Sequence, residues 1–325
     1  MQIAIDVGYS CVKAVTQDGR VIIPSVVSSH RELILADLSR NGTGHIVEIR
    51  KQDGTTGRYF VGELALREGH AASFTLDREK HRHPNHDILV YTAARILEAG
   101  MNATLAAGLP VAYYRAQREE LRRHLEGLQA EVSVNGGNAE TVSFRKVIVY
   151  PQGAGALLTA PNLPASGLVL LVDPGQKTTE YVTAEVAGGL VKPVSSLCGS
   201  IELGVHTVHE AVAAEFQART GAPLAAVRVP EVIAGDGRTC YYGKEIDLSR
   251  ALEKARADVA LAIADQVQSA LGDRYAFVRR IYLAGGGALA LPSLAEMFPG
   301  AQILPEPQWA NATGFLKVLS DISQV

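Results

Sequence analysis

Short apolar segments separated by turn signals fill the first part of the chain. Two apolar stretches within residues 2–15 flank a turn at Gly8 and Tyr9, and Asp18-Gly19 marks a further tight turn before another apolar stretch. This order is typical of a β-meander. Residues 30–69 continue with strand-like pieces between turn signals, which predicts an inserted, mostly β, subdomain.

Helical spacing of apolar residues first appears after this β-rich region. Residues 87–100 carry Ile88 and Tyr91 at helical spacing and end at a glycine, which predicts a helix with a glycine C-cap. A strand at 103–109 and a charged helix at 116–125 are expected next. Arginines alternate with glutamates in the charged helix, so a surface helix of nearly balanced charge is predicted.

The opening pattern returns at the middle of the chain. A continuous apolar stretch at 168–172 runs into Asp173-Pro174-Gly175 and is followed by a second strand-like stretch at 179–186. From Asp6 to Asp173 the offset is 173 − 6 = 167 residues, about half of the 325 residues. A repeat of strand, Asp-x-Gly turn and strand at this offset predicts two similar halves. The other elements predicted in the second half are helices at 205–217 and 248–271, a strand-and-turn region at 227–244, a strand at 280–283, a glycine turn at 285–287 and a helix beginning at 292.

Composition narrows the class of protein. With 325 residues, of which 47% are hydrophobic and 20% charged, the chain is long enough for two globular domains. No apolar run reaches the roughly 20 residues of a membrane-spanning helix, and no basic-then-apolar leader precedes the first strand, so a cytoplasmic protein without a membrane partner is expected. The net charge of −3 argues against direct nucleic-acid binding. Cys11, Cys198 and Cys240 are far apart and form no CxxC pair, so reduced, buried thiols are expected.

A histidine-rich patch follows the first β-rich region. It consists of His81, His83, His86 and Asp87. The spacing fits neither helical i, i+4 pairs nor a zinc pattern. A solvated loop is therefore the interpretation favoured for this patch.

The two Asp-x-Gly turns have the composition of phosphate-binding turns. Glycines let backbone N–H groups approach one cluster of phosphate oxygens without interfering side chains. Asp6 ends one strand and Lys13 lies on the returning strand, where its ammonium group is expected to meet a β- or γ-phosphate. Asp173 is expected opposite Asp6, and two such carboxylates suit Mg²⁺, which keeps most of its water ligands. Thr178 and Thr179 add hydroxyls near the γ-phosphate. A single Asp-x-Gly triplet is more often a plain surface turn, but its occurrence after an apolar strand in both halves favours a phosphate clamp.

Five segments, in order, resemble the motifs of the actin/Hsp70/sugar-kinase superfamily. Residues 6–13 (DVGYSCVK) resemble the first phosphate motif, and residues 170–180 (LLVDPGQKTTE) resemble the second. Between them, residues 149–156 (VYPQGAGA) resemble the connecting segment. Residues 283–288 (LAGGGA) resemble the adenosine motif, and residues 309–315 (WANATGF) resemble the second connecting helix. Two stretches, 107–114 (AGLPVAYY) and 310–317 (ANATGFLK), further resemble the ParM/StbA group of plasmid-segregation actins.

The resemblance implies an α/β, actin-like (ribonuclease H-like) fold: a duplicated two-lobed ATPase with a nucleotide cleft between the lobes. Lobe I is expected at 1–155 plus 305–325, with an inserted small subdomain at about 29–86, and lobe II at 156–304, with a small subdomain at about 218–272. The implied cofactors are ATP or ADP and Mg²⁺. The implied activity is ATP hydrolysis coupled to polymerisation into filaments, for plasmid or DNA segregation or cytoskeletal positioning. The implied partners are the chain itself and a DNA-binding adaptor protein.

The resemblance also assigns roles to single residues. Gln152 stands where the family places the residue that positions the attacking water; an amide orients water but is a poor base, and phosphoryl transfer depends mostly on positioning and charge stabilisation. The alternative for Gln152 is a polar residue after Pro151 that caps a helix. The implied phosphate-binding residues are Gly8, Tyr9, Ser10, Lys13, Gly175, Gln176, Thr178 and Thr179; the adenosine-binding residues are Gly204, Gly285, Gly286 and Gly287; Asp6 and Asp173 hold the metal through waters.

Four positions depart from the family pattern: Tyr9, Gln176, Lys177, and Glu180, which stands where Asp is common. Tyr9 stands where a small phosphate-touching residue is usual, so the contact is left between Tyr9 and Ser10. Gln176 and Lys177 stand where glycines are common, which predicts a less open second turn. Gly204 is explained either by close approach to the nucleotide or by local turn chemistry.

Two other functions are compatible with the same fold. A small-molecule kinase needs an Asp base at a substrate pocket in the first lobe, and no Asp stands in a matching motif there. A non-hydrolysing actin-like scaffold has no need of a hydrolytic residue at Gln152. Stimulation of ADP formation by a sugar or carboxylic acid would indicate the kinase, and the effect of Gln152→Ala on phosphate release separates the scaffold from the hydrolysing protein.

Overall fold

The computed structural model describes residues 1–33, 44–70, 73–74, 79 and 82–322. The chain forms two compact units, which we call unit 1 (Met1–Leu158 with Asn311–Val325) and unit 2 (Thr159–Ala310). The divisions therefore lie at 158/159 and 310/311, whereas the sequence places them at 155/156 and 304/305. Among the described residues, the helices are too short or too polar to span a bilayer.

Unit 1 is built on one large sheet. Its strands are β1 (Gln2–Val7), β2 (Cys11–Val15), β3 (Arg20–Pro24), β4 (Val26–Ser29), β5 (His45–Lys51), β6 (Thr56–Val61), β7 (Ser73–Phe74), β8 (Ala103–Leu109), β9 (Gln129–Val134) and β10 (Glu140–Pro151). Within the described residues their order is β3-β2-β1-β8-β10-β9-β5-β6-β4-β7. The helices are α1 (Glu63–Glu68), α2 (Pro84–Ile96), α3 (Val111–Glu126), α4 (Ala154–Leu157) and α10 (Ala310–Ile322). The segment predicted to form an inserted β subdomain thus extends the main sheet through β5 and β6, and its residues 34–43 lie outside the described part.

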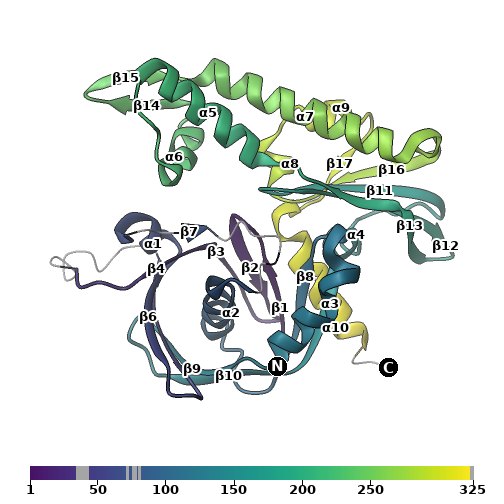
Figure 1. Cartoon of the computed structure of the whole chain (residues 1–325). Helices are drawn as coiled ribbons and strands as arrows, with labels where there is room; N and C mark the ends of the chain where they lie inside the picture. The colour runs from purple at the N-terminus through teal and green to yellow at the C-terminus, as the bar shows by residue number, and fades with distance from the viewer. Residues whose placement is uncertain (34–43, 71–72, 75–78, 80–81, 323–325) are drawn as a thin grey trace. The chain divides into compact units, whose positions relative to one another are not determined.

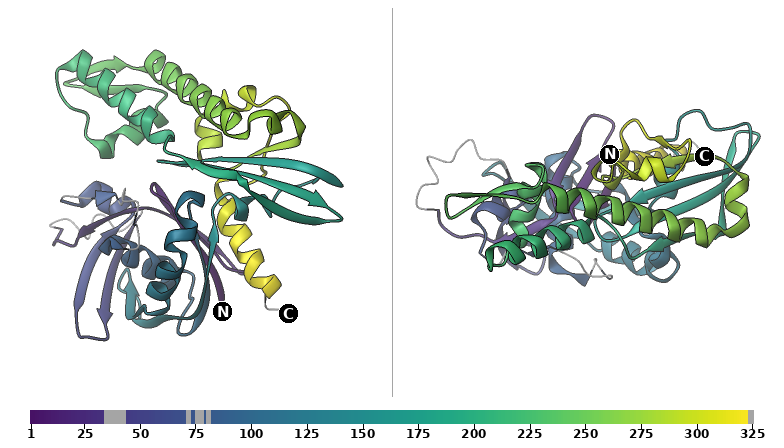
Figure 2. Two further views of the ribbon diagram at one scale, coloured as in Figure 1. Left: turned by 45° about the vertical axis from the view of Figure 1, so that its right-hand side comes forward. Right: turned by 90° about the horizontal axis from the view of Figure 1, so that it is seen from above.

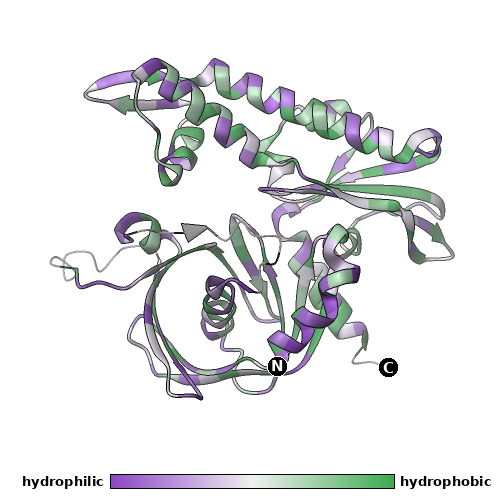
Figure 3. Ribbon diagram, viewed as in Figure 1, coloured by the Kyte–Doolittle hydropathy of each residue, from purple (hydrophilic) through white to green (hydrophobic). Residues whose placement is uncertain are grey.

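Successive side chains of the central strands point to opposite faces of the sheet, so the core of unit 1 has two layers. Ile3 and Ile5 of β1 pack in the cluster that includes α2 and α3, while Ala4 points to the other face, where it meets Phe315 of α10. This is the period of two expected of a strand covered on both faces. Figure 1 shows the sheet curving around α2. Most residues of α2 are buried, as in a helix enclosed by other elements, and the apolar strands stand out in Figure 3.

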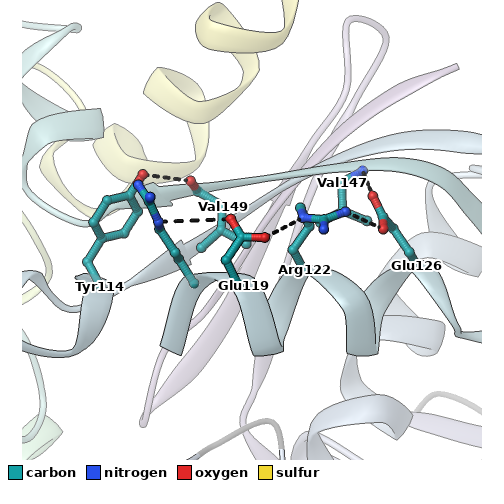
Figure 4. Close-up of polar contacts among 7 residues, drawn as sticks. Tyr114, Glu119, Arg122, Glu126, Val147 and Val149 are labelled. Carbon is teal, nitrogen blue, oxygen red and sulfur yellow. Dashed lines mark hydrogen bonds and ion pairs between the residues drawn. The ribbon is translucent and has the colours of Figure 1, made fainter. Parts of the chain in front are cut away.

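Helix α3 covers the open edge of β10. Beyond Ser143, β10 pairs with β8 on one side, and no other strand of the described chain pairs with its opposite edge. There a carboxylate oxygen of Glu126 accepts a hydrogen bond from Val147 N at 3.4 Å, and Tyr114 Oη donates to Val149 O at 3.3 Å (Figure 4). Uncovered strand edges are sites of unwanted pairing, and a helix across the edge prevents it. The helix is charged on its outer side, as predicted.

Unit 2 is a five-stranded sheet with helices packed on it. The strands are β11 (Ser166–Pro174), β12 (Thr179–Ala187), β13 (Leu190–Ile201), β16 (Val278–Leu283) and β17 (Gln302–Ile303), with a separate hairpin of β14 (Arg238–Tyr241) and β15 (Lys244–Asp247). The helices are α5 (Val205–Thr220), α6 (Val229–Ala234), α7 (Ser249–Leu271), α8 (Gly287–Ala290) and α9 (Leu294–Met297), with 3-10 turns at Ala226–Arg228, Gly272–Phe277 and Pro307–Trp309. Helices α5 and α7 lie over one face of the sheet (Figure 2). There Val208 and Ile263 pack with Leu170 and Val172 of β11.

The two sheets repeat one topology, as the duplicated Asp-x-Gly pattern predicts. In unit 1 the order β3-β2-β1-β8-β10 corresponds to β13-β12-β11-β16-β17 in unit 2. In each set an antiparallel three-stranded meander is followed by strands parallel to its first strand. The register repeats too: Asp6 pairs with Lys13, Asp173 pairs with Glu180, and the offset of 167 residues relates both members of the pair. The predicted α/β, duplicated actin-like architecture is confirmed.

Three local predictions are wrong. Residues 227–244 include the predicted strand, β14, but begin with helix α6, because Pro230 in its first turn suits a helix start and the apolar residues around it pack into the core of unit 2. Cys240 is exposed rather than buried, since it lies on the small β14–β15 hairpin. The charged helix begins at Val111 rather than at residue 116, directly after Pro110.

The histidine-rich patch is also not a solvated loop. Pro84 opens α2, and the His83 ring caps the helix by accepting a hydrogen bond from Asn85 N at 3.2 Å. His86 therefore lies in the first helical turn and is only 5% exposed. The proline and the cap start the helix earlier than the apolar spacing indicated. His81 lies outside the described residues.

We expect Glu126→Ala to lower the free energy of unfolding by about 1–2 kcal/mol, because it removes an acceptor of the Val147 N–H and the carboxylate that pairs with Arg122 at 2.6 Å. Chemical denaturation measures this change. The matched control is Glu119→Ala on the same helix, whose 55% exposed carboxylate pairs with Arg122 at 3.1 Å and should cost less than about 0.5 kcal/mol. Equal losses in both variants would contradict a role for Glu126 at the edge of β10.

Candidate functional site

The first Asp-x-Gly turn lies between β1 and β2 and is held by hydrogen bonds around Gly8. Gly8 N donates to Asp6 O and to Cys11 O, each at 3.1 Å, and Ser25 Oγ donates to Gly8 O at 2.7 Å. A Cβ atom on Gly8 would lie 2.7 Å from Cys11 O, so the turn requires glycine. Ser25 has no motif signal in the sequence, and only the fold brings it to this turn.

The side chains of the first turn divide between core and surface. Tyr9 is buried and belongs to the hydrophobic core, whereas Ser10 is exposed. Of the two residues left open by the sequence, Ser10 is thus the one whose hydroxyl faces outward from the turn. Lys13 is the register partner of Asp6 on β2. Its Nζ lies 3.4 Å from where a Cβ of Gly8 would be, so the ammonium group sits beside the glycine turn.

Gln152 is joined directly to Asp6. Its Nε2 donates to Asp6 Oδ1 at 2.7 Å, and both side chains are buried. The backbone of Gln152 is fixed as well, because its N–H donates to Leu109 O at 2.8 Å. With Nε2 used by the carboxylate, the Oε1 atom remains the acceptor with which the amide can orient a water.

Small residues behind Gln152 bring α10 close to the end of β10. Gly153 has φ of +74°, and its N–H donates to Asn311 Oδ1 at 2.9 Å. A Cβ on Gly155 would lie 2.4 Å from the Phe315 ring, and one on Gly314 would lie 1.8 Å from Gly155 O. The segment at 149–156 and the one at 309–315, singled out separately in the sequence, are therefore packed together in unit 1.

The second Asp-x-Gly turn lies between β11 and β12. Gly175 N donates to Thr178 O at 2.8 Å and closes the turn. Thr178 and Thr179 are buried, and Thr179 Oγ1 donates to Leu203 O at 2.7 Å. The hydroxyl proton of Thr179 is thus used inside unit 2. Asp173, at the end of β11, is also buried.

Gly204 holds α5 against this second turn. Val205 N donates to Gly175 O at 3.0 Å and His206 N donates to Gln176 O at 2.7 Å. A Cβ on Gly204 would lie 2.6 Å from Gly175 O. Of the two explanations left open for Gly204, close approach to the nucleotide and local turn chemistry, these contacts support the second, because they require a glycine beside the 175–176 turn.

A partly buried histidine also lies beside the second turn. His209 Nδ1 is 3.4 Å from Gln176 Nε2. Burial, with a smaller contribution from His206, lowers the pKa of His209 to about 4, so its ring is neutral at pH 7 and can accept from the Gln176 amide. No sequence motif points to His209, which is brought to Gln176 by the packing of α5.

The third glycine turn packs directly on the second. Gly285 has φ of +74°, and a Cβ there would lie 2.1 Å from Asp173 Oδ1; one on Gly287 would lie 2.3 Å from Pro174 O. Gly286 has more open surroundings, because a Cβ added there would have a Gln308 side-chain atom at 3.9 Å as its nearest neighbour. Unit 2 thus brings residues predicted to bind metal, phosphate and adenosine to one place, with Gly285 and Gly287 packed against the Asp173–Pro174 segment.

Two family models match the chain in sequence order. The model described as "Actin like proteins N terminal domain" matches residues 4–155. The model described as "Archaeal actin homologue MreB-like, C-terminal" matches residues 171–296. The matches place the first phosphate turn and Gln152 in the first model, and the second and third glycine turns in the second.

Relatives resemble the chain over nearly its whole length. An archaeal actin homologue of Thermoplasma acidophilum is 22% identical over 331 residues, covering 96% of this chain and 97% of the relative. A 15-stranded ParM filament from Clostridium botulinum has a TM-score of 0.90 and 26% identity, covering 98% of this chain and 99% of the other. An archaeal actin homologue in complex with ADP has a TM-score of 0.78 and 20% identity, covering 98% and 99%.

We expect Gly285→Ala to destabilise the protein by about 1–3 kcal/mol, because the new methyl group meets Asp173 Oδ1 and the backbone is in the left-handed region. Gly286→Ala is the matched control, since its backbone is helical, with φ of −66° and ψ of −27°, and its surroundings are open. Chemical denaturation of both variants without nucleotide measures the difference. If Gly286→Ala were as destabilising as Gly285→Ala, the close packing of the third turn on Asp173 would not be the cause.

Proposed function

The chain belongs to the actin-like proteins, and we propose that it binds ATP with Mg²⁺, hydrolyses the ATP and polymerises into filaments that position or segregate DNA, such as a plasmid. The buried hydrogen bond between Gln152 and Asp6 is the observation that carries the hydrolytic part of this proposal. It places an amide suited to water positioning beside a carboxylate suited to Mg²⁺. The likeness to a ParM filament supports the proposal of self-assembly.

ATP binding is supported by the bare glycine turns. In unit 2, Gly285 and Gly287 pack against the Asp173–Pro174 segment without side chains of their own, and a related chain of the same fold binds ADP. Backbone around a carboxylate suits a nucleotide and its phosphates, which need close approach and many donors. The residues proposed for adenosine are Gly204, Gly285, Gly286 and Gly287; those for phosphate are Gly8, Tyr9 or Ser10, Lys13, Gly175, Gln176, Thr178 and Thr179.

Asp6 and Asp173 are the residues proposed to hold Mg²⁺ through waters. Each is buried at the carboxyl end of a central strand, and oxygen ligands with retained waters are what Mg²⁺ prefers. When bound, Mg²⁺ supplies positive charge to the phosphate oxygens. Lys13, next to the first glycine turn, adds a further cation in unit 1.

Gln152 is proposed to orient the attacking water. Asp6 holds its amide nitrogen, and the Leu109 carbonyl holds its backbone, so Oε1 accepts a hydrogen bond from water in a fixed direction. Positioning of this kind is a large part of catalysis of phosphoryl transfer, because little covalent chemistry falls to the protein. A neutral amide also avoids adding a negative charge beside the phosphates.

Filament formation is proposed to follow the nucleotide state. Head-to-tail contacts between identical chains give helical filaments when the rotation does not close into a ring. ATP would favour assembly, and hydrolysis would weaken the contacts. A DNA-binding adaptor protein would link such a filament to its cargo, in keeping with a chain whose net charge of −3 gives no electrostatic attraction to DNA.

Sedimentation and phosphate release test the proposal together. At high protein concentration we expect a pellet and filaments in electron micrographs with ATP and Mg²⁺, fewer with ADP, and phosphate release without any added acceptor. Filaments without phosphate release would favour a non-hydrolysing scaffold. ADP formation that needs a sugar or another hydroxyl compound would favour a small-molecule kinase. No ATP-dependent sedimentation would reject polymerisation.

For Gln152→Ala we expect phosphate release to fall about 100-fold, because the water loses its acceptor, while ATP still binds through the glycine turns. A coupled phosphate assay gives the rate, and a fluorescent nucleotide gives the affinity. Gln129→Ala, at an exposed glutamine of β9, is the control and should hydrolyse ATP at the wild-type rate. An unchanged rate in Gln152→Ala would show that this residue is not catalytic.

A further inference from the structure

Three potential metal ligands from two helices meet in unit 1, apart from the residues proposed for nucleotide. They are His86 and Asp87 in the first turns of α2 and His124 in the last turn of α3. His124 Nε2 lies 2.6 Å from Asp87 Oδ1, and His86 Nδ1 lies 3.6 Å from the same oxygen. No other such group of three occurs among the described residues.

We propose that His86, Asp87 and His124 form a binding site for one divalent transition-metal ion, with Zn²⁺ as its natural occupant. Two imidazole nitrogens and one carboxylate oxygen are a ligand set typical of zinc, whereas Mg²⁺ takes oxygen ligands. A fourth position is left for water. The site is independent of the proposed function, because none of its residues is among those assigned to ATP.

The separations of the ligand atoms suit a small metal ion. Zinc bonds of about 2.0–2.1 Å in a tetrahedron place ligand atoms about 3.3 Å apart. The distances of 2.6 Å and 3.6 Å lie on either side of that value, and the three ligand atoms all lie within 4.8 Å of one another. The three atoms therefore lie close enough together for small side-chain rotations to bring them to a common metal distance.

Burial and charge favour a cation at this place. His86 is buried, and the Asp87 side chain is 16% exposed. The Asp87 carboxylate oxygen lies between ring nitrogens of His86 and His124, so one oxygen and two nitrogen ligands face one another in a largely buried place.

A surface groove gives the metal a route to the site. Asp87 and His124 line it together with Lys51, Arg82, Glu119 and Glu120. Arg82 is paired with Glu120 at 2.8 Å and with Glu79 at 2.8 Å, so much of the surrounding charge is already neutralised. Three protein ligands rather than four predict micromolar affinity rather than that of a closed structural site.

Occupation of the site would join α2 to α3. The three ligands come from helices that are separate in sequence, and both helices pack on the same core. A metal that binds only the folded arrangement raises the stability of the protein in proportion to its concentration over the Kd. Zinc would therefore act here as a structural cross-link in unit 1.

The test uses the full chain, freed of any histidine tag, stripped with chelator and without nucleotide. Calorimetry with ZnCl₂ should give one ion per chain in the micromolar range, not displaced by a large excess of Mg²⁺, and the melting temperature should rise with zinc. Asp87→Asn and His124→Gln should each weaken binding at least 10-fold. His206→Gln is the matched control, because His206 and Glu210 of α5 form a His–carboxylate pair at 3.5 Å without a third ligand, and it should bind like wild type.

A second measurement covers the case in which the variants fail to fold. Co²⁺ added to the wild-type protein should give the intense visible absorption of a four-coordinate site, and Zn²⁺ should remove it. Absence of stoichiometric zinc binding by the wild type would overturn the proposal and leave the trio as a proton-linked hydrogen bond. Undiminished binding in folded Asp87→Asn and His124→Gln would also overturn it.

Discussion

Close approach of neighbouring segments to glycine Cα atoms is the constraint on which the candidate site depends. A Cβ atom at Gly285, Gly287 or Gly204 would overlap the segment 173–176. In unit 1, a Cβ on Gly8 would meet Cys11 O, and one on Gly155 would meet Phe315. These glycines are required first by contacts within the protein. Because they carry no side chains, the same contacts leave peptide groups and the carboxylates of Asp6 and Asp173 as the main chemistry at the strand ends.

Duplication explains why the same arrangement appears twice, and divergence explains why the halves are not equivalent. The register of β1 with β2 repeats in β11 with β12, so Lys13 of unit 1 corresponds to Glu180 of unit 2. One half therefore carries a cation beside its glycine turn. The other carries a buried acid that accepts a hydrogen bond from Ser200. The two turns therefore share one geometry but have opposite charge at the paired position.

The sequence predicted the parts of the structure that depend on local pattern. Apolar runs that end at Asp6 and Asp173 gave the central strands, and the offset between them gave the repeat. Contacts between distant residues were not predictable in this way. Asn311 caps Gly153 and Ser25 holds Gly8, yet no sequence pattern pairs either residue with its partner. His124 lies 37 residues from Asp87 along the chain, so the patch at 81–87 was interpreted without its partner.

Strand β10 connects the surface helix α3, which covers its edge, to Gln152, the residue proposed to orient water. Helix α3 donates to and accepts from β10 at Val149 and Val147. The same strand ends at Pro151, directly before Gln152. Gln152 in turn is bonded to Asp6 of β1, and β1 and β10 are both paired to β8. A shift of β10 relative to β8 would therefore move the Gln152 amide relative to Asp6. Since α3 is also one of the two helices that meet at His86, Asp87 and His124, anchoring this helix to α2 restrains the strand that positions Gln152.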